Sequence, residues 1–292
     1  MKKLFAFCLL LSAFCFLPCT LQAQTRVFHN KIKGNGKLIT KTISISNFSK
    51  IEIDTKVDVN FSQAPNRGCL DFTVDDNLLD YFDVYTKDNI LYIKIIDEYM
   101  ENGVYLDLYP KKCLIKVSSE QLENIKMRGG TINFNTAFTS KILNIEHKGS
   151  GKVLANKYPV QIDEIKITNT GSGKIELAGT IQRADIQMKG SGSTKFSGAI
   201  RQADIQISGS GSIQLAGTIQ NADIQLKGSG SIKALECKIA QMNIGVSGSG
   251  SAEIYVTDTL DVNLRGSGSV RFKGDPYPFT KNIAGSGKIK KL

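Results

Sequence analysis

Tryptophan is absent from this 292-residue chain, histidine occurs only twice, and cysteine is too sparse for a disulfide framework. Half of the six cysteines fall within the first 23 residues, which leaves Cys69, Cys113 and Cys237 for the rest of the chain. Three thiols allow at most one internal disulfide, and the sequence does not decide whether any two of them pair. Their spacing, with so few histidines, fits no zinc-binding pattern. We therefore expect no disulfide-stapled scaffold, no metal and no other cofactor.

Concentrated positive charge is also missing, although the formal net charge is +10. Lysine and arginine are scattered along the chain, and the clearest basic run is the terminal KIKK. Binding of nucleic acid requires a concentrated basic patch, so we expect no nucleic-acid partner. A dispersed positive charge is better suited to an anionic polymer of a cell surface.

Long apolar runs are confined to the N-terminus, which reads MKKLFAFCLLLSAFCFLPCTLQAQ. Two lysines precede a short apolar stretch and Ala23 stands at a suitable cleavage point, so residues 1–23 are predicted to be a secretory signal peptide. Pro18 makes the sequence before Cys19 a poor lipid-attachment motif. No later run is long enough for a transmembrane segment. We expect an exported protein of the periplasm, the outer-membrane surface or the extracellular space.

The sequence does contain one tripeptide that returns at regular intervals. Gly-Ser-Gly recurs at spacings of 22, 19, 19, 19, 20, 18 and 19 residues, and its first residues are Gly149, Gly171, Gly190, Gly209, Gly228, Gly248, Gly266 and Gly285. A flexible linker would not keep this register, whereas self-similarity at such a period is typical of solenoids. A phosphate-binding glycine loop would precede a helix, but each triplet here precedes a strand-like segment. We interpret the triplets as structural corners, where glycine tolerates positive φ and close stacking.

Between the triplets, apolar and polar residues alternate with a period of two, which predicts half-buried strands of five or six residues. If two residues are inserted just before the Gly171 triplet, the units align into three apolar columns: Ile165, Ile186, Ile205, Ile224, Ile244 and Val262; Ile167, Met188, Ile207, Leu226, Val246 and Leu264; and Val153, Ile175, Thr194, Ile213, Ile232, Ala252, Val270 and Ile289. Stacked like residues fill the core of a parallel β-helix, whose coils pair about 4.8 Å apart. Chirality rules favour a right-handed path. We predict an all-β protein with a right-handed parallel β-helix, or solenoid, over residues 129–292.

Residues 24–128 lack the repeat but contain several alternating segments, which predicts a β-rich N-terminal cap or irregular first coils. This region contains GNGKLITKTISISNFSKIEIDTKVDVNFSQ and VDDNLLDYFDVYTKDNILYIKI, and stacked GSGS(I/V) units follow it. Together these features resemble the putative auto-transporter adhesin, head GIN domain family, over about Lys33 to Leu292. The resemblance implies a β-helix in secreted or envelope proteins of Bacteroidetes-type bacteria, and it carries no catalytic residues to transfer.

Three groups of residues are candidates for a functional site. One group is a column of outward-facing acids that could hold calcium: Asp185, Asp204, Asp223 and Asp261, with Glu164 before them and Asn243 interrupting. These acids stand in the middle of strands rather than in a glycine turn, which favours a solvated polar face over a calcium site. Six tyrosines could form a sugar-binding platform or pack within the cap: Tyr81, Tyr85, Tyr92, Tyr99, Tyr105 and Tyr109. His147 aligns with Met188 and Leu226, so it is predicted to pack inward, and His29 has no evident catalytic partner.

These features favour a non-enzymatic, adhesin-like or structural protein of the cell envelope that binds a surface glycan or another envelope protein. Two alternatives remain open: a polysaccharide lyase whose basic and acidic residues meet across coils, and a passive spacer. Tyrosines and irregular sequence concentrate in residues 25–130, so we expect any ligand to bind there. The oligomeric state is left open.

Overall fold

The computed structural model describes residues 28–96 and 104–292. The predicted signal peptide and Tyr99 lie outside these described residues. Within them the chain is almost wholly β-structure, with one 3₁₀ helix, η1 (Asp76–Tyr81). No helix in the two described ranges is long and apolar enough to cross a membrane.

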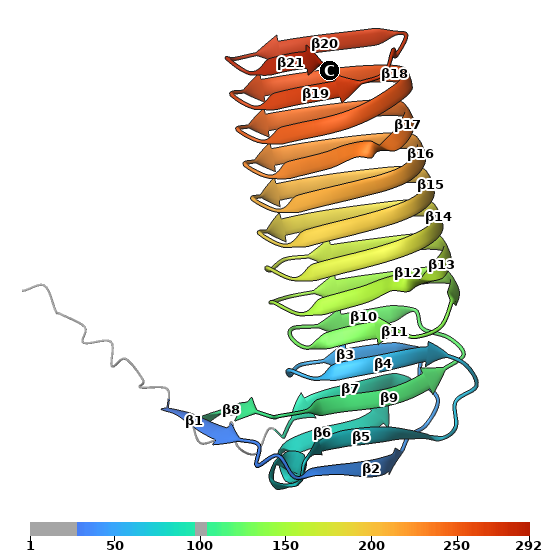
Figure 1. The fold of residues 1–292 in the computed structure, drawn as a ribbon, viewed down its shortest axis with the longest axis vertical. Coiled ribbons are helices and arrows are strands. Elements are labelled where there is room, and N and C mark those ends of the chain that lie inside the picture. The colour runs from blue at the N-terminus through green and yellow to red at the C-terminus, as the bar shows by residue number, and fades with distance from the viewer. Residues whose placement is uncertain (1–27, 97–103) are drawn as a thin grey trace, which may run out of the picture.

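The C-terminal part is a parallel β-solenoid, seen in Figure 1 as a stack of coils. Its strands run between successive glycine-rich corners: β12 (Phe138–His147), β13 (Lys152–Asn169), β14 (Lys174–Gly190), β15 (Ser193–Gly209), β16 (Ser212–Gly228), β17 (Ser231–Gly248) and β18 (Ser251–Gly266). From β13 onward they have 16–18 residues rather than the five or six expected. The reason is that parallel pairing continues through a bend in mid-coil, for example at Gly179↔Gly198.

The solenoid core consists of apolar side chains stacked from coil to coil. Strand pairing confirms the predicted column from Val153 to Ile289 at every position. In a second column, Ile205, Ile224 and Ile244 follow one another and are at most 1% exposed. Each coil therefore completes the core of its neighbours, as in other solenoids.

The coil that ends at Gly171 has a different register from the predicted one. Ile167 pairs with Ile186, and Asn169 rather than Ile167 pairs with Met188. The inserted residues lie between Ala155 and Val160, where the pairing shifts. The alternation was misleading because a buried asparagine occupies an apolar position in this coil.

The coil stack begins before the first Gly-Ser-Gly triplet. Strands β10 (Asn124–Met127) and β11 (Thr131–Phe134) form one coil, and β3 (Lys50–Ile53) and β4 (Asp58–Gln63) pair with them in parallel from below. Strands β7 (Ile90–Ile95) and β9 (Cys113–Ser119) extend the same two faces by one more layer. Residues 64–123 are thus inserted between two coils that stack directly on each other.

Antiparallel strands close the N-terminal end of the stack and form the β-rich cap. Strand β5 (Cys69–Asp75) pairs antiparallel with both β9 and β2 (Leu38–Ser44), and β6 (Phe82–Lys87) forms a hairpin with β7. A separate parallel pair, β1 (Phe28–Lys33) and β8 (Val104–Tyr109), projects beside the first coils as an arm (Figure 1). At the opposite end β19 (Ser269–Lys273) and β20 (Phe279–Ala284) form one coil on β18, and β21 (Lys288–Lys291) pairs with β19 as the start of the next coil.

Candidate functional site

The predicted tyrosine cluster is distributed over several parts of the cap. Tyr85 and Tyr92 face each other across the β6–β7 hairpin, with ring centroids 5.1 Å apart. Tyr81 ends η1 and packs against the core, and Tyr105 lies on β8, paired in register with His29. Tyr109, at the end of β8, is 45% exposed and lines a pocket.

This pocket, of about 250 Å³, lies where the β1–β8 arm meets the corners of the first coils. Three successive corners supply part of its lining: Asp54, Thr55 and Lys56 between β3 and β4; Arg128 and Gly129 between β10 and β11; and Ser150 of the first triplet. Strand β8 supplies Leu106, Asp107, Leu108 and Tyr109. The regular coils have Gly-Ser-Gly at their corners, whereas the corner between β3 and β4 contains no glycine and carries Lys56.

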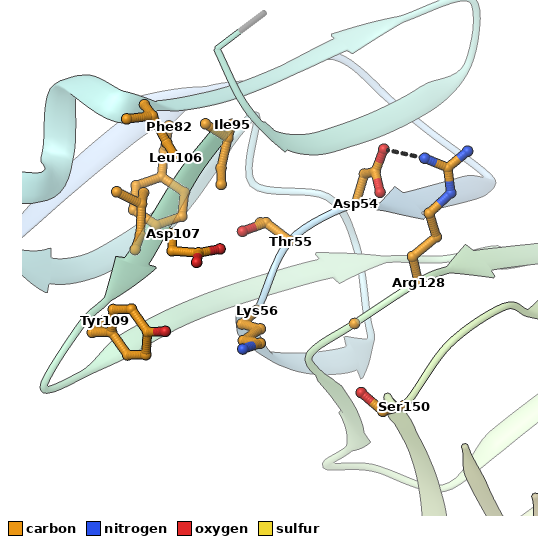
Figure 2. Close-up of a pocket in the computed structure, with 12 residues that line it drawn as sticks. Asp54, Thr55, Lys56, Phe82, Ile95, Leu106, Asp107, Tyr109, Arg128 and Ser150 are labelled. Carbon is orange, nitrogen blue, oxygen red and sulfur yellow. Dashed lines mark hydrogen bonds and ion pairs between the residues drawn. The ribbon is translucent and has the colours of Figure 1, made fainter. Parts of the chain in front are cut away.

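The pocket has an apolar side and a charged side. Figure 2 shows Phe82, Ile95 and Leu106 grouped together, with the Asp54–Arg128 pair across the pocket from them. The Arg128 Nη1 atom lies 2.9 Å from Asp54 Oδ2. Such a combination of apolar wall and a few polar groups is typical of a site for a small molecule.

A second hollow, of about 500 Å³, adjoins the pocket and shares Lys56 and Ser150 with it. Four lysines line this hollow (Lys56, Lys111, Lys112 and Lys152), and among the described residues Asp58 is its one lining carboxylate. Among the described residues, none of the four lysines forms an ion pair. The Lys56 ammonium instead lies 6.0 Å from the centroid of the Tyr109 ring. We call this second hollow the lysine hollow.

A buried carboxylate fixes the backbone that presents two of these lysines. Asp75 is fully buried and accepts hydrogen bonds from the backbone N–H groups of Gly36 at 2.6 Å and of Lys111 at 2.8 Å, with Lys112 at 3.4 Å. Burial raises the pKa of Asp75, but these hydrogen bonds outweigh it and hold the pKa below its ordinary value. A Cβ on Gly34 would come within 2.4 Å of this carboxylate, so only glycine fits there.

The acidic column on the coils differs from the prediction in the residue that precedes its first aspartate. Asp185, Asp204, Asp223, Asn243 and Asp261 do pair in register, but Lys166 precedes them, and Glu164 pairs with Arg183 instead. The cause is the register shift after Ala155. Asn243 and Gln225 donate hydrogen bonds to the Asp223 carboxylate, each at 3.1 Å. Within the described ranges, no group of three His, Cys, Asp or Glu residues is arranged to hold a metal ion.

The glycine triplets form the edge of the coil stack. Seven of their first glycines have φ between 101° and 130°, the exception being Gly171. At Gly171 a Cβ would lie 2.2 Å from the Gly149 carbonyl oxygen, so close stacking requires glycine there. Corner serines donate backbone hydrogen bonds to the coil before, as Ser210 does to the Gly190 carbonyl at 3.1 Å.

His147 packs inward, as predicted, and is fully buried. Its Nδ1 lies 3.3 Å from Asn169 Oδ1, and within the described part of the chain its Nε2 has no hydrogen-bond partner. Desolvation lowers the pKa of this imidazole, although the contact with Asn169 opposes the shift. The alignment of His147 with Met188 and Leu226 predicted its burial correctly, but it did not predict that Asn169 lies beside the imidazole ring.

In the part of the chain that the structure describes, Cys69, Cys113 and Cys237 are all free thiols. Burial raises the pKa of the Cys113 and Cys237 thiols to about 12, so both are protonated at neutral pH. Cys69 is half-buried on β5.

Solved structures with the same architecture cover most of this chain. A structure titled "Putative lipid binding protein" from Parabacteroides distasonis ATCC 8503 shares 27% identity, covers 90% of this chain and 100% of its own, and has a TM-score of 0.69. A "putative adhesin" from the same organism matches with 27% identity, the same coverage and a TM-score of 0.67. Another from Parabacteroides merdae ATCC 43184 has 26% identity, covers 90% and 99% of the two chains, and has a TM-score of 0.67.

Comparison by sequence gives the family directly. Among curated proteins, no sequence match was found. The family model described as "Putative auto-transporter adhesin, head GIN domain" matches residues 47–201 and 185–276, which together span most of the cap and nearly all of the coils. The chain therefore belongs to this head GIN domain family.

Proposed function

We propose that the protein is exported to the cell envelope and acts there as a non-enzymatic, adhesin-like binding protein. The cap recognises the ligand, and the coils are the rod that carries it. The observation behind this proposal is the position of the pocket, where apolar and charged side chains from the arm and the first corners meet. In the regular coils, in contrast, the same residue types recur in register from one coil to the next, as at Asp185, Asp204 and Asp223.

The names of similar structures are consistent with such a role. Two are described as putative adhesins and one as a putative lipid-binding protein. All three names denote binding rather than catalysis. A surface glycan or another envelope protein is the kind of partner that an adhesin-like role requires.

The proposal can be tested by binding of the purified mature protein to a glycan array and to intact bacterial cells. We expect binding to survive deletion of residues 209–227, which removes one coil and keeps the register of the rest. We expect the Tyr109→Ala variant to lose most of it. Tyr255→Ala is the matched control, because Tyr255 also carries a lysine over its ring, 4.9 Å away, but lies on the coils. Loss on coil deletion, or equal binding by the two tyrosine variants, would place recognition elsewhere.

The lyase alternative has a direct assay. Incubation with acidic polysaccharides should release no unsaturated sugar that absorbs in the ultraviolet. Release that disappears on substitution of a basic residue of the coils would make the protein an enzyme. A passive spacer would show no specific binding to the glycan array or to intact cells, and it would release no sugar.

A further inference from the structure

We propose that the pocket and the lysine hollow are two halves of one site, which takes an anionic amphiphile. An alkyl chain occupies the pocket, and a phosphate or similar anionic head group lies among the lysines. This inference rests on the proposed function, which places the ligand at this junction, and it adds that the part of the envelope partner bound here is an anionic amphiphile.

The apolar half is formed by Phe82, Ile95 and Leu106, which come from three different strands. Phe82 is 8% exposed, and the other two are half-buried. These side chains lie together on one side of the pocket, as Figure 2 shows. A hydrocarbon chain placed against them would be removed from water on several sides, which is the main source of affinity for an apolar ligand.

The basic half brings together like charges from three segments that are distant in the sequence. Lys56 lies in the first corner, Lys111 and Lys112 precede β9, and Lys152 begins β13. All four are exposed, and within the described chain no carboxylate forms an ion pair with them. Ammonium groups gathered around one hollow create a positive potential that an anion relieves. The buried Asp75 carboxylate holds the backbone of Lys111, so this arrangement exists before any ligand binds.

The two halves are continuous because Lys56 and Ser150 line both of them. A neutral amphiphile would leave the lysines without a partner, and a free anion would make no use of the apolar wall. A ligand with a charged head and a hydrocarbon tail satisfies both halves. The Asp54–Arg128 pair borders the pocket and already neutralises its own charges, so it does not compete for the head group.

The first test is calorimetry on the mature protein with alkyl phosphates of increasing length, from hexyl to dodecyl, below their critical micelle concentrations. Burial of a methylene in the pocket should tighten binding about fourfold per added methylene. The gain should stop once the pocket is filled. Affinity that does not depend on chain length would overturn the assignment of the tail to the pocket.

The second test concerns the head group. Dodecyl phosphate should bind more tightly than neutral dodecyl maltoside and than inorganic phosphate alone, and added salt should weaken its binding. The Lys111→Gln/Lys112→Gln double variant should lose about tenfold in affinity, since each exposed charged contact contributes modestly. Both side chains are exposed and only their backbone N–H groups contact Asp75, so the variant should fold normally. The control, Lys189→Gln/Lys227→Gln, removes the same charge from the edge of the coils and should bind like the wild type.

Outcomes that would overturn the inference differ from those that concern the proposed function. Equal binding of dodecyl phosphate and dodecyl maltoside, or equal affinity of the two double variants, would remove the lysines from the site. Inorganic phosphate as tight as dodecyl phosphate would indicate a free-anion site instead. If no alkyl phosphate binds while binding to glycans or cells still requires Tyr109, the ligand class is wrong and the proposed function stands.

Discussion

Replacing Asp75 by alanine should destabilise the cap far more than replacing its neighbour Asp76. The Asp75 carboxylate is fully buried and joins three chain segments: the Gly34–Gly36 turn, the end of β5, and the residues before β9. Asp76 lies nearer the surface, where it accepts a hydrogen bond from Asn35 and pairs with Lys37 at 3.1 Å. The two substitutions remove the same chemical group one residue apart.

The magnitude follows from the donors that alanine would leave without an acceptor. Two backbone N–H groups, those of Gly36 and Lys111, lie within 2.8 Å of Asp75 oxygens. A buried donor that loses its acceptor costs about 1–3 kcal/mol. Gly36 and Lys111 are themselves exposed, so water can reach part of each group and moderates the loss. We expect a decrease of about 2–4 kcal/mol in the free energy of unfolding. For Asp76→Ala the decrease should be much smaller, because exposed ion pairs contribute little.

The same carboxylate makes the cap sensitive to acid. The pKa of Asp75 is lower in the folded protein than in the unfolded chain, where an aspartate has a pKa of about 3.9. Its contribution to stability is therefore complete above about pH 4 and is lost as the pH falls through the folded pKa. In the Asp75→Asn variant this component is absent, so the difference from the wild type should be largest at neutral pH and should shrink in acid.

Guanidinium unfolding and native-state hydrogen exchange together provide the assay. Solenoids and their caps can unfold in separate steps, so a single melting temperature does not localise the effect. Exchange at Gly36 and Lys111 should accelerate in Asp75→Ala and remain slow in Asp76→Ala. Equal losses of stability in the two alanine variants, or unchanged exchange at both amides, would refute the role assigned to Asp75.

Three further predictions concern the core, the buried histidine and the N-terminus. Ile224→Ala should lower the free energy of unfolding, measured in urea, by about 2–5 kcal/mol, because Ile224 is fully buried. Gln214→Ala, on the exposed face, should change it little. Equal losses would contradict the assignment of the two faces. The pKa of His147 is lower in the folded protein than in the unfolded chain, so the stability of the wild type should fall as the pH drops below about 6.5 toward that lowered value. The His147→Leu variant should lack this fall. Thermal melts of both proteins at pH 7.5 and pH 5 provide the comparison. Intact-mass analysis of the exported protein should show loss of residues 1–23, and their retention would exclude the predicted signal peptide.

The solenoid could be predicted from sequence because each of its coils repeats the same constraint. An apolar residue every second position, and glycine every nineteen or so residues, leaves little freedom in how the coils stack. Val153, Ile175 and Thr194 are therefore found where their spacing places them. The prediction was wrong at Asn169, because periodicity assigns a polar residue to the surface and this asparagine is buried. Its side-chain amide is satisfied inside the core by His147 of the coil before and by the Gly173 carbonyl of its own corner, and periodicity reveals neither contact.

The pocket could not be predicted, because its lining comes from residues between Asp54 and Ser150 that meet only through an insertion between stacked coils. One local signal was available: the corners at 54–56 and 128–130 read DTK and RGG rather than GSG. The corner at 54–56 contains no glycine, and its Lys56 departs from the purely structural pattern of the coils, whereas Asp54 and Arg128 stand level with Lys148, just before a triplet. The tyrosines lie in the region that contains the pocket, but composition could not separate Tyr109 at the pocket from the Tyr85–Tyr92 pair on the hairpin.

The parallel pairing between coils also determines how the rod responds to mechanical force. Hydrogen bonds between coils run along the axis of the stack, so a pull on a chain end peels the outermost coil from its neighbour bond by bond, along a ladder like that of β14 and β15. When one such ladder ruptures, a coil of 19 residues is released and extends to roughly 65 Å in place of its rise of about 4.8 Å. Single-molecule pulling should therefore show successive steps of roughly 60 Å. A rod built in this way would lengthen coil by coil under load while its cap stays folded.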